Sequence, residues 1–333
     1  FFETERPAIA HPHYRVPQRR TGEPWWIASY SALRIASQAV DGAGPETASR
    51  HGDLSPETPE DQKLFDDDAG DIDDGQAALV SAGTGMHRFP RGPGPGTFLH
   101  GLFEWAGEEG FADVAGDDQR IVDAVARRCN RRGWEAWITP LARWLSALLN
   151  DDLPLGPRGG AFRLAGLASY QVEMEFWFES RHVDVRHIDA LVRRHVLANA
   201  PRPALEPALL NGMFKGFMDL AFEHEGRYYV ADYKSNWLGA SDAAYTMEAM
   251  RGEILAKRYD LQYVLYLLAL HRQLAVRLPD YDYDRHLGGA VYLFLRGSRA
   301  PTKGVFFDRP PRELIEALDS LFAGAPQPVE AGR

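Results

Sequence analysis

The sequence predicts an α/β fold in which helices flank a small mixed sheet. Two observations support this prediction. Long segments repeat hydrophobic residues at helical spacing, and shorter segments rich in Phe, Tyr, Val and Leu have the composition of strands. The chain has 333 residues, of which 45% are hydrophobic and eight are Trp. That length and composition allow a sizeable core in one large domain or two smaller ones.

The first part of the chain has little periodicity. Residues 1–24 contain several prolines and are predicted to be a linker from an upstream domain. Residues 25–40 have the pattern of a short helix that enters the main domain. The chain starts at Phe1 and not at Met, which suggests a piece of a longer polypeptide.

Residues 41–85 are predicted to be an acidic, mobile insertion. The chain has a formal net charge of −10, and residues 41–76 hold twelve acidic and two basic residues. This segment therefore carries the whole negative excess, and it is poor in apolar residues. The rest of the chain is nearly neutral and can hold local basic patches. The candidates, each of which could also be an ordinary solvated helix face, are Arg127-Arg128 with Arg131-Arg132, Arg193-Arg194, and Arg251/Lys257/Arg258.

Cysteine content and hydropathy limit the class of protein. Cys129 is the only cysteine, which excludes an internal disulfide framework and a cysteine-based zinc site. A single cysteine is compatible with the reducing cytoplasm. The sequence contains no signal peptide and no apolar run of the roughly 18 residues that a membrane span needs. We therefore expect a cytoplasmic protein without a membrane segment.

The main domain, residues 86–325, is predicted to contain both helices and strands, and residues 326–333 to be a tail. Pro140 lies within one predicted helix, so it either kinks that helix or shows that the helix starts later. The predicted helices are 97–108, 117–131, 134–150, 186–199, 242–257, 258–277 and 311–323. The predicted strands are 170–178, 217–224, 227–233, 288–295 and 304–307.

A predicted hairpin with a two-residue turn at 225–226 brings three charged residues together. Counting outward from the turn places Asp219 opposite Asp232, with Cβ atoms roughly 5 Å apart. Lys234 is two residues further along the strand and shares the face of Asp232. Two carboxylates this close repel unless a cation lies between them, which suggests a divalent-cation site with a lysine that handles protons. The alternative is a solvated hairpin face on which Lys234 simply pairs with Asp232.

Several segments resemble a known family. Gly216-x-x-Asp219 followed by Asp232-x-Lys234 resembles the signature of the PD-(D/E)xK nuclease superfamily. Longer segments resemble the nuclease domains of RecB proteins, which are helicase–nuclease subunits of bacterial double-strand-break repair complexes. The similarity covers about 86–325 and, more faintly, 25–34, and its main segments are 228–239, 258–266 and 288–297.

The resemblance implies a restriction-endonuclease-like PD-(D/E)xK fold and a Mg²⁺-dependent deoxyribonuclease of the exodeoxyribonuclease V type. Such an enzyme hydrolyses phosphodiester bonds during double-strand-break processing and recombination. Ca²⁺ would occupy its site without supporting cleavage. The implied catalytic residues are Lys234, Asp219 and Asp232. The implied metal ligands are His100, Asp219, Asp232, the backbone carbonyl of Tyr233 and, as a further candidate, Glu173.

Two of these implied ligands lie outside the hairpin. His100 is expected in the first turns of a helix that Thr97 caps. Glu173 matches the family position on the strand before the hairpin, where alternation places Glu173 and Glu175 on one face. Val172, Met174 and Phe176 would lie on the other face. The alternative is that both glutamates face solvent.

The last implied pair is Gln262 and Tyr266, which are four residues apart and project from one face of a predicted helix. The pair matches a Gln-x-x-x-Tyr motif of RecB-like nucleases, which is thought to position the DNA strand near the metal. The expected core stripe of the same helix is Tyr259, Tyr263, Leu267 and Leu270.

The resemblance also implies partners. They are DNA, with a single strand at the site, RecC-like and RecD-like subunits, and a RecA-like recombinase. Two other functions remain open at this point. The domain could be a catalytically dispensable docking platform for a recombinase, or a stand-alone repair nuclease of the same superfamily.

Overall fold

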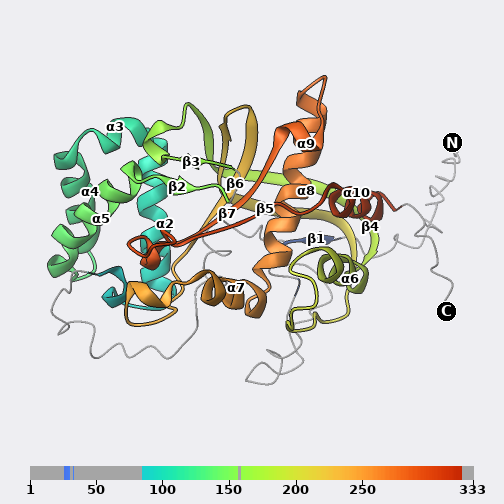
Figure 1. Ribbon diagram of the computed structural model, residues 1–333, viewed down its shortest axis with the longest axis horizontal. Helices are drawn as coiled ribbons and strands as arrows, with labels where there is room; N and C mark the ends of the chain where they lie inside the picture. The colour runs from blue at the N-terminus through green and yellow to red at the C-terminus, as the bar shows by residue number, and fades with distance from the viewer. Residues whose placement is uncertain (1–25, 31–32, 34–84, 157–158, 325–333) are drawn as a thin grey trace, which may run out of the picture.

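The computed structural model describes residues 26–30, 33, 85–156 and 159–324 (Figure 1). Within these residues six strands form one mixed sheet in the order β1-β5-β6-β7-β8, with β4 paired to the other edge of β5. β1–β5 and β6–β7 are parallel pairs, and the other pairs are antiparallel. The strands are β1 (Trp26–Ala28), β4 (Ser169–Asp184), β5 (Leu209–His224), β6 (Arg227–Lys234), β7 (Leu287–Phe294) and β8 (Val305–Asp308), and a separate small pair is β2 (Leu153–Pro154) and β3 (Ala161–Phe162).

Helices pack on both faces of the sheet, as predicted. In Figure 1, α2 to α5 lie at one end of the molecule, and α6, α8 and α10 lie at the other. The first group is α2 (Pro93–Glu108), α3 (Phe111–Ala115), α4 (Asp118–Asn130) and α5 (Ile138–Asn150). The others are α6 (Val185–His195), α7 (Met247–Ala256), α8 (Tyr259–Arg277), α9 (Tyr283–His286) and α10 (Arg312–Phe322).

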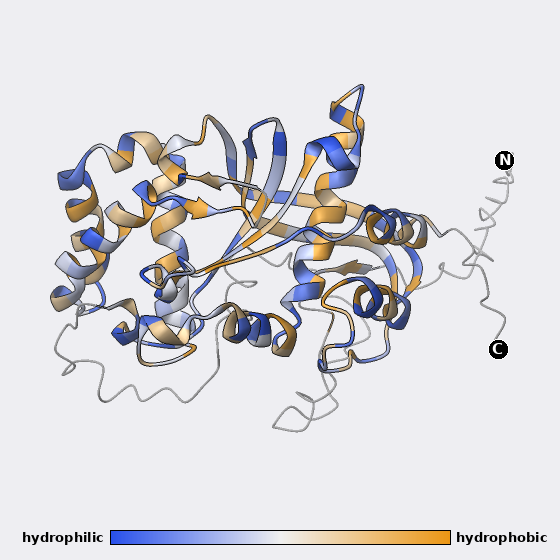
Figure 2. Cartoon of the chain, in the orientation of Figure 1, coloured by the Kyte–Doolittle hydropathy of each residue, from blue (hydrophilic) through white to orange (hydrophobic). Residues whose placement is uncertain are grey.

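Two hydrophobic cores lie on opposite faces of the sheet. We call them the α2-side core and the α8-side core after their longest helices. The hydrophobic residues in Figure 2 run along the central strands and α8, while the outer helices carry more hydrophilic residues. Representative buried residues of the α2-side core are Leu102, Leu145, Leu220, Ala231 and Val291. Those of the α8-side core are Phe176, Met218, Val230, Leu265 and Leu318.

The predicted entry helix over residues 25–40 is wrong where the structure describes it. Trp26–Ala28 is strand β1, which pairs in parallel with Gly212–Phe214 of β5. Gly212 makes this pairing possible, because a Cβ at this position would lie 2.0 Å from the Trp26 carbonyl oxygen. Beyond β1, only residues 29, 30 and 33 of the entry segment are described. The predicted linker, almost all of the acidic insertion and the predicted tail lie outside the described residues.

Several helix boundaries differ from the prediction. α2 begins at Pro93 with Gly92 as its N-cap, so Thr97 is inside the helix and does not cap it. A proline is well suited to the first turn, because its fixed φ is helical and its missing N–H has no intrahelical acceptor there. The same reason applies to Pro140, because α5 begins at Ile138 after a 3₁₀ turn. The predicted helix over 134–150 therefore started too early.

The hairpin is confirmed. β5 and β6 pair His224 with Arg227 around a two-residue turn. Glu225 and Gly226 have φ angles of 50° and 76°. Positive φ at both positions is typical of the turns whose twist matches paired strands.

The predicted alternation on β4 is wrong at Glu173. This residue has a φ of 46°, which is outside the extended region. Val172 packs against the α2-side core, whereas Met174 and Phe176 belong to the α8-side core. The irregular backbone at Glu173 therefore breaks the alternation of β4, so that Val172 lies on one face of the sheet and Met174 and Phe176 lie on the other.

A buried ion network fixes the start of α8. Asp260 is 0% exposed and accepts hydrogen bonds from Arg202 (2.6 Å) and Arg258 (3.1 Å). Arg258 also pairs with Asp189 of α6 at 2.6 Å, and Arg193 pairs with the same carboxylate at 2.8 Å. Arg258 and Arg193 thus hold structural elements together, which corrects the prediction that they belong to exposed basic patches.

No helix among the described residues is long and apolar enough to cross a membrane.

We predict that Asp260→Ala lowers the free energy of unfolding by about 3–5 kcal/mol, because it leaves the buried Arg202 without its counter-charge and removes one of the two carboxylates that Arg258 contacts. Urea denaturation followed by circular dichroism measures this change. The matched control is Asp319→Ala, which removes a half-exposed partner of Arg272 and should cost about 1 kcal/mol or less. Equal effects of the two variants would contradict the prediction.

Candidate active site

The site begins at a gap along one edge of β5. β6 pairs with residues 220–224 of this edge, and β1 pairs with residues 212–214. Among the described residues no strand pairs with the intervening residues 215–219 on this edge. Asp219 is the last residue of the gap, immediately before the paired segment.

Asp219 occupies the point where β5 and β6 separate. The antiparallel ladder ends at Leu220 and Ala231, one pair before the predicted pairing of Asp219 with Asp232. Instead, Asp219 Oδ2 accepts a hydrogen bond from the backbone N–H of Tyr233 at 2.7 Å. The same oxygen lies 3.3 Å from Nδ1 of His100, which α2 supplies. His100 is therefore confirmed as a neighbour of Asp219.

Asp232 and Lys234 form a buried pair on the neighbouring strand. Their side chains are 4% and 1% exposed, and Lys234 Nζ lies 2.8 Å from Asp232 Oδ2. The ammonium group also lies 4.0 Å from the ring centroid of Tyr259 and 5.3 Å from that of Tyr292. A counter-ion and two aromatic faces thus compensate a charge that burial would otherwise destabilise.

The two pairs approach Tyr233 from different directions. Asp219 meets His100 from α2, whereas Lys234 contacts Tyr259 from α8. The prediction that all three charged side chains share one face therefore holds only for Asp232 and Lys234. The reason is the separation of the strands, which turns Asp219 into the gap.

Tyr233 lies among the acidic residues. Its ring stacks on Phe103 of α2 at 4.6 Å. Burial raises the pKa of the Tyr233 hydroxyl well above its usual range, and the charges of Asp219, Glu173 and Asp232 raise this pKa further. All three implied acidic ligands are therefore near this residue. The Tyr233 hydroxyl is buried and has no hydrogen-bond partner among the described residues.

Gln262 and Tyr266 belong to a buried network behind Lys234. Gln262 Nε2 donates to the Tyr266 hydroxyl at 3.1 Å, and Tyr292 donates to Gln262 Oε1 at 2.7 Å. Gln262 and Tyr266 are 2% and 3% exposed. Tyr292 thus links this pair to Lys234, whose ammonium group it faces.

Sequence reasoning missed the site roles of two residues. Tyr292 lies opposite Asp232 in the parallel β6–β7 ladder. Tyr259 was expected only as a core residue, and its hydroxyl accepts a hydrogen bond from Asn236 Nδ2 at 3.2 Å. No local motif marks these residues, since a parallel register between distant strands is not visible in the sequence.

The donor chemistry of the site fits a hard divalent cation, although its spacing is not that of an assembled metal site. Carboxylate and carbonyl oxygens are the ligands that Mg²⁺ and Ca²⁺ prefer. Asp219, Asp232 and the carbonyl of Tyr233 offer such oxygens, and His100 adds a nitrogen. In the described part of the chain no three His, Cys, Asp or Glu side chains are close enough to one another to hold a metal ion.

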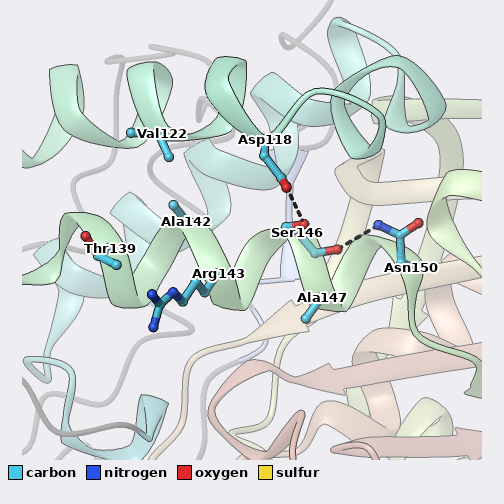
Figure 3. A pocket seen from close by; sticks show the side chains of 8 residues that line it. All are labelled: Asp118, Val122, Thr139, Ala142, Arg143, Ser146, Ala147 and Asn150. Atoms are coloured by element: carbon cyan, nitrogen blue, oxygen red, sulfur yellow. Dashed lines mark hydrogen bonds between the residues drawn. The ribbon is translucent and has the colours of Figure 1, made fainter.

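A hollow between α4 and α5 lies away from these groups. Figure 3 shows Ser146 at its centre, where its hydroxyl donates to Asp118 at 2.9 Å. The hollow contains none of the predicted site residues. Its lining is Asp118, Val122, Thr139, Ala142, Arg143, Ser146, Ala147 and Asn150.

One predicted basic patch remains at the end of α4. Arg132 lies 5.2 Å from the ring of Phe98, and Arg128 lies 5.3 Å from that of Trp105. Burial and then the neighbouring arginines lower the pKa of Arg128. Within the described ranges none of Arg127, Arg128, Arg131 and Arg132 forms an ion pair with a carboxylate. This patch is therefore free to contact an anionic ligand.

Comparison with known proteins identifies the family. Residues 83–329 match the PD-(D/E)XK nuclease superfamily, so the chain belongs to this superfamily. Its relatives include the RecBCD enzyme subunit RecB of Escherichia coli K12, with 40% identity over 92% of this chain. The RecB subunits of Haemophilus influenzae and Mycolicibacterium smegmatis are 35% and 30% identical over 90% and 89% of it. These matches cover 24%, 24% and 29% of the relatives, so the chain spans about a quarter of their length.

Family membership and the mixed sheet between helices confirm the predicted fold class and the resemblance to RecB nuclease domains. The chain is thus a RecB-like nuclease domain of the PD-(D/E)XK superfamily. The boundaries predicted for the linker, insertion and tail remain predictions.

We predict that Tyr233→Phe leaves stability unchanged or raises it by about 1 kcal/mol, because it removes a buried hydroxyl that has no partner. Urea denaturation measures the change. The control is Tyr263→Phe, which removes a hydroxyl that donates to Asp308 at 2.6 Å and should destabilise the protein. A loss of more than about 1 kcal/mol in Tyr233→Phe would indicate an unrecognised partner of this hydroxyl.

Proposed function

We propose that this domain hydrolyses phosphodiester bonds of DNA in a Mg²⁺-dependent reaction, within a RecB-type helicase–nuclease of the exodeoxyribonuclease V type. The observation that carries this proposal is the arrangement around Tyr233. A carboxylate–lysine pair and a carboxylate–histidine pair meet where two strands separate. The RecB relatives are named as subunits of the RecBCD enzyme, which supports a place in a larger complex, and the nuclease superfamily supports phosphodiester cleavage.

The cation would be held by Asp219, Asp232, His100 and the carbonyl of Tyr233, with Glu173 as a further ligand. When bound, Mg²⁺ would polarise the phosphoryl group and lower the pKa of a bound water. We expect Ca²⁺ to bind without supporting cleavage. Occupation of the site requires small movements of these side chains, since Asp219 now accepts a hydrogen bond from the Tyr233 N–H and Asp232 is ion-paired with Lys234.

Lys234 is the group of this chain best placed to act on the reacting phosphate. Its ammonium group is held by Asp232 and by the faces of Tyr259 and Tyr292. It would orient the attacking water or offset the charge that develops on the phosphate. Asp232 holds the ammonium group in position.

Gln262 and Tyr266 would position the DNA strand. Both are buried, and Tyr292 connects Gln262 to the face on which Lys234 lies. We infer that they act on the strand through this network. The exposed arginines at the end of α4 would add phosphate contacts, which weaken as salt rises.

The RecB relatives support the proposal that this domain works in a larger assembly. The name RecBCD implies RecC-like and RecD-like partner subunits for those proteins. We propose that this domain works beside similar subunits on a single strand that a helicase delivers. A RecA-like recombinase is a further proposed partner.

We predict that Asp232→Asn and Lys234→Met each lower the rate of DNA cleavage by about 100-fold or more, because each removes a group that acts on the reacting phosphate or its cation. A gel assay of linear DNA with Mg²⁺ measures this rate. Asp319→Asn is the control, since it changes an aspartate on the outer helix α10, and it should cleave at the normal rate. Thermal unfolding of each variant separates loss of activity from loss of fold, and cleavage retained by folded Asp232→Asn would refute the mechanism.

We predict that chelation of divalent cations stops cleavage and that added Mg²⁺ restores it, because carboxylate oxygens bind hard cations. Isothermal titration should show Mg²⁺ and Ca²⁺ binding that Asp219→Asn weakens at least 10-fold by removing one ligand charge. Cleavage that continues in excess chelator would contradict the proposed cofactor.

A further inference from the structure

The exposed face of β4 and β5 beside the gap carries an unusual group of side chains. Register pairs Glu175 with Phe217 and Trp177 with Lys215. Directly opposed residues point to the same face, so these four side chains form a two-by-two patch, which we call the β4–β5 patch. Asp219 follows Phe217 by two residues on the same strand, which corresponds to about 7 Å.

Two members of the β4–β5 patch are open to solvent, and Phe217 beside them is half-buried. Trp177 is 43% exposed, and the side chain of Glu175 is 45% exposed. The neighbouring residues Phe176 and Phe178 point to the opposite face and are buried in the α8-side core. An exposed tryptophan on a strand whose buried face is already complete is not needed for the core.

Lys215 holds the patch in a defined arrangement. Its ammonium group lies 2.9 Å from Glu175 Oε1. The same group lies 5.0 Å from the ring centroid of Trp177 and 4.7 Å from that of Phe217. The side chain of Lys215 is only 8% exposed. Because these contacts order both rings in advance, a ligand that stacks on them loses little conformational entropy.

The chemistry of the patch favours unpaired nucleobases as its ligand. Aromatic faces stack on any nucleobase, and only unpaired bases expose their faces. Glu175 already neutralises Lys215, so the patch offers stacking more than positive charge. The patch lies beside the gap, because Asp219 is two residues beyond Phe217 on β5.

We propose that the β4–β5 patch is a base-stacking site for single-stranded DNA, in which Trp177 and Phe217 hold bases adjacent to the phosphate that is cleaved. This inference rests on the proposed nuclease function and adds a substrate subsite to it. The site favours a single strand over a duplex and discriminates little between base sequences.

The test measures binding of a fluorescent oligothymidine by the full chain with Ca²⁺, using anisotropy. Trp177→Ala and Phe217→Ala should each weaken binding about 5- to 100-fold, because stacking on one base contributes at this level. Trp177→Phe should retain binding within a few-fold. Val276→Ala, which truncates an 87% exposed residue at the end of α8, is the matched control and should bind normally.

A second measurement assigns the effect to bases. An oligonucleotide with abasic positions should bind the unchanged protein more weakly, and Trp177→Ala should not weaken it further. The loss caused by Trp177→Ala should also vary little with salt, since the substitution removes no phosphate contact. Additive effects of the abasic DNA and the substitution would overturn the proposal.

The outcomes separate the two proposals. Normal DNA binding by Trp177→Ala in a protein that cleaves DNA would overturn the stacking site and leave the nuclease function intact. Binding that depends on Trp177 in a protein that does not cleave would support the stacking site and refute the nuclease function. Normal DNA binding with weakened association to a partner subunit would show a protein interface, which also overturns the proposal.

Discussion

The hydrogen bond from the Tyr233 backbone to Asp219 is the contact on which the site depends. It ends the β5–β6 ladder, because the carboxylate takes the N–H that lies just beyond the last strand pair. Once the two strands separate, β6 continues beside β7 and carries Asp232 and Lys234 with it. The same separation leaves residues 215–219 between the segments of this β5 edge that pair with β1 and with β6. The site is therefore a consequence of where strand pairing stops.

Buried charge is tolerated because each charged group has a compensating neighbour. Lys234 has Asp232 and two tyrosine rings, and the start of α8 has Asp260 between two arginines. Burying an ion without a partner costs several kcal/mol, so these contacts are requirements of the fold. The network at the start of α8 also helps to position the site, since this helix supplies Tyr259 and Gln262.

Two groups of surface side chains offer different kinds of contact to a ligand. Arg128 and Arg132 at the end of α4 lie against the rings of α2 and form no ion pair with a carboxylate within the described residues. The β4–β5 patch combines the exposed ring of Trp177 and the half-buried ring of Phe217 with a lysine that Glu175 neutralises. Phosphates suit the first and unpaired bases suit the second, as the proposed single-stranded DNA substrate requires.

The sequence by itself determined the hairpin, the spacing of Asp219, Asp232 and Lys234, and the α/β class. These depend on local turn chemistry and periodicity, which neighbouring residues encode. Only the tertiary structure decided that Trp26–Ala28 is a strand, that β4 changes face at Glu173, and that Asp219 turns into a gap. Each of these depends on contacts between segments far apart in the chain, where pairing and packing override local preference.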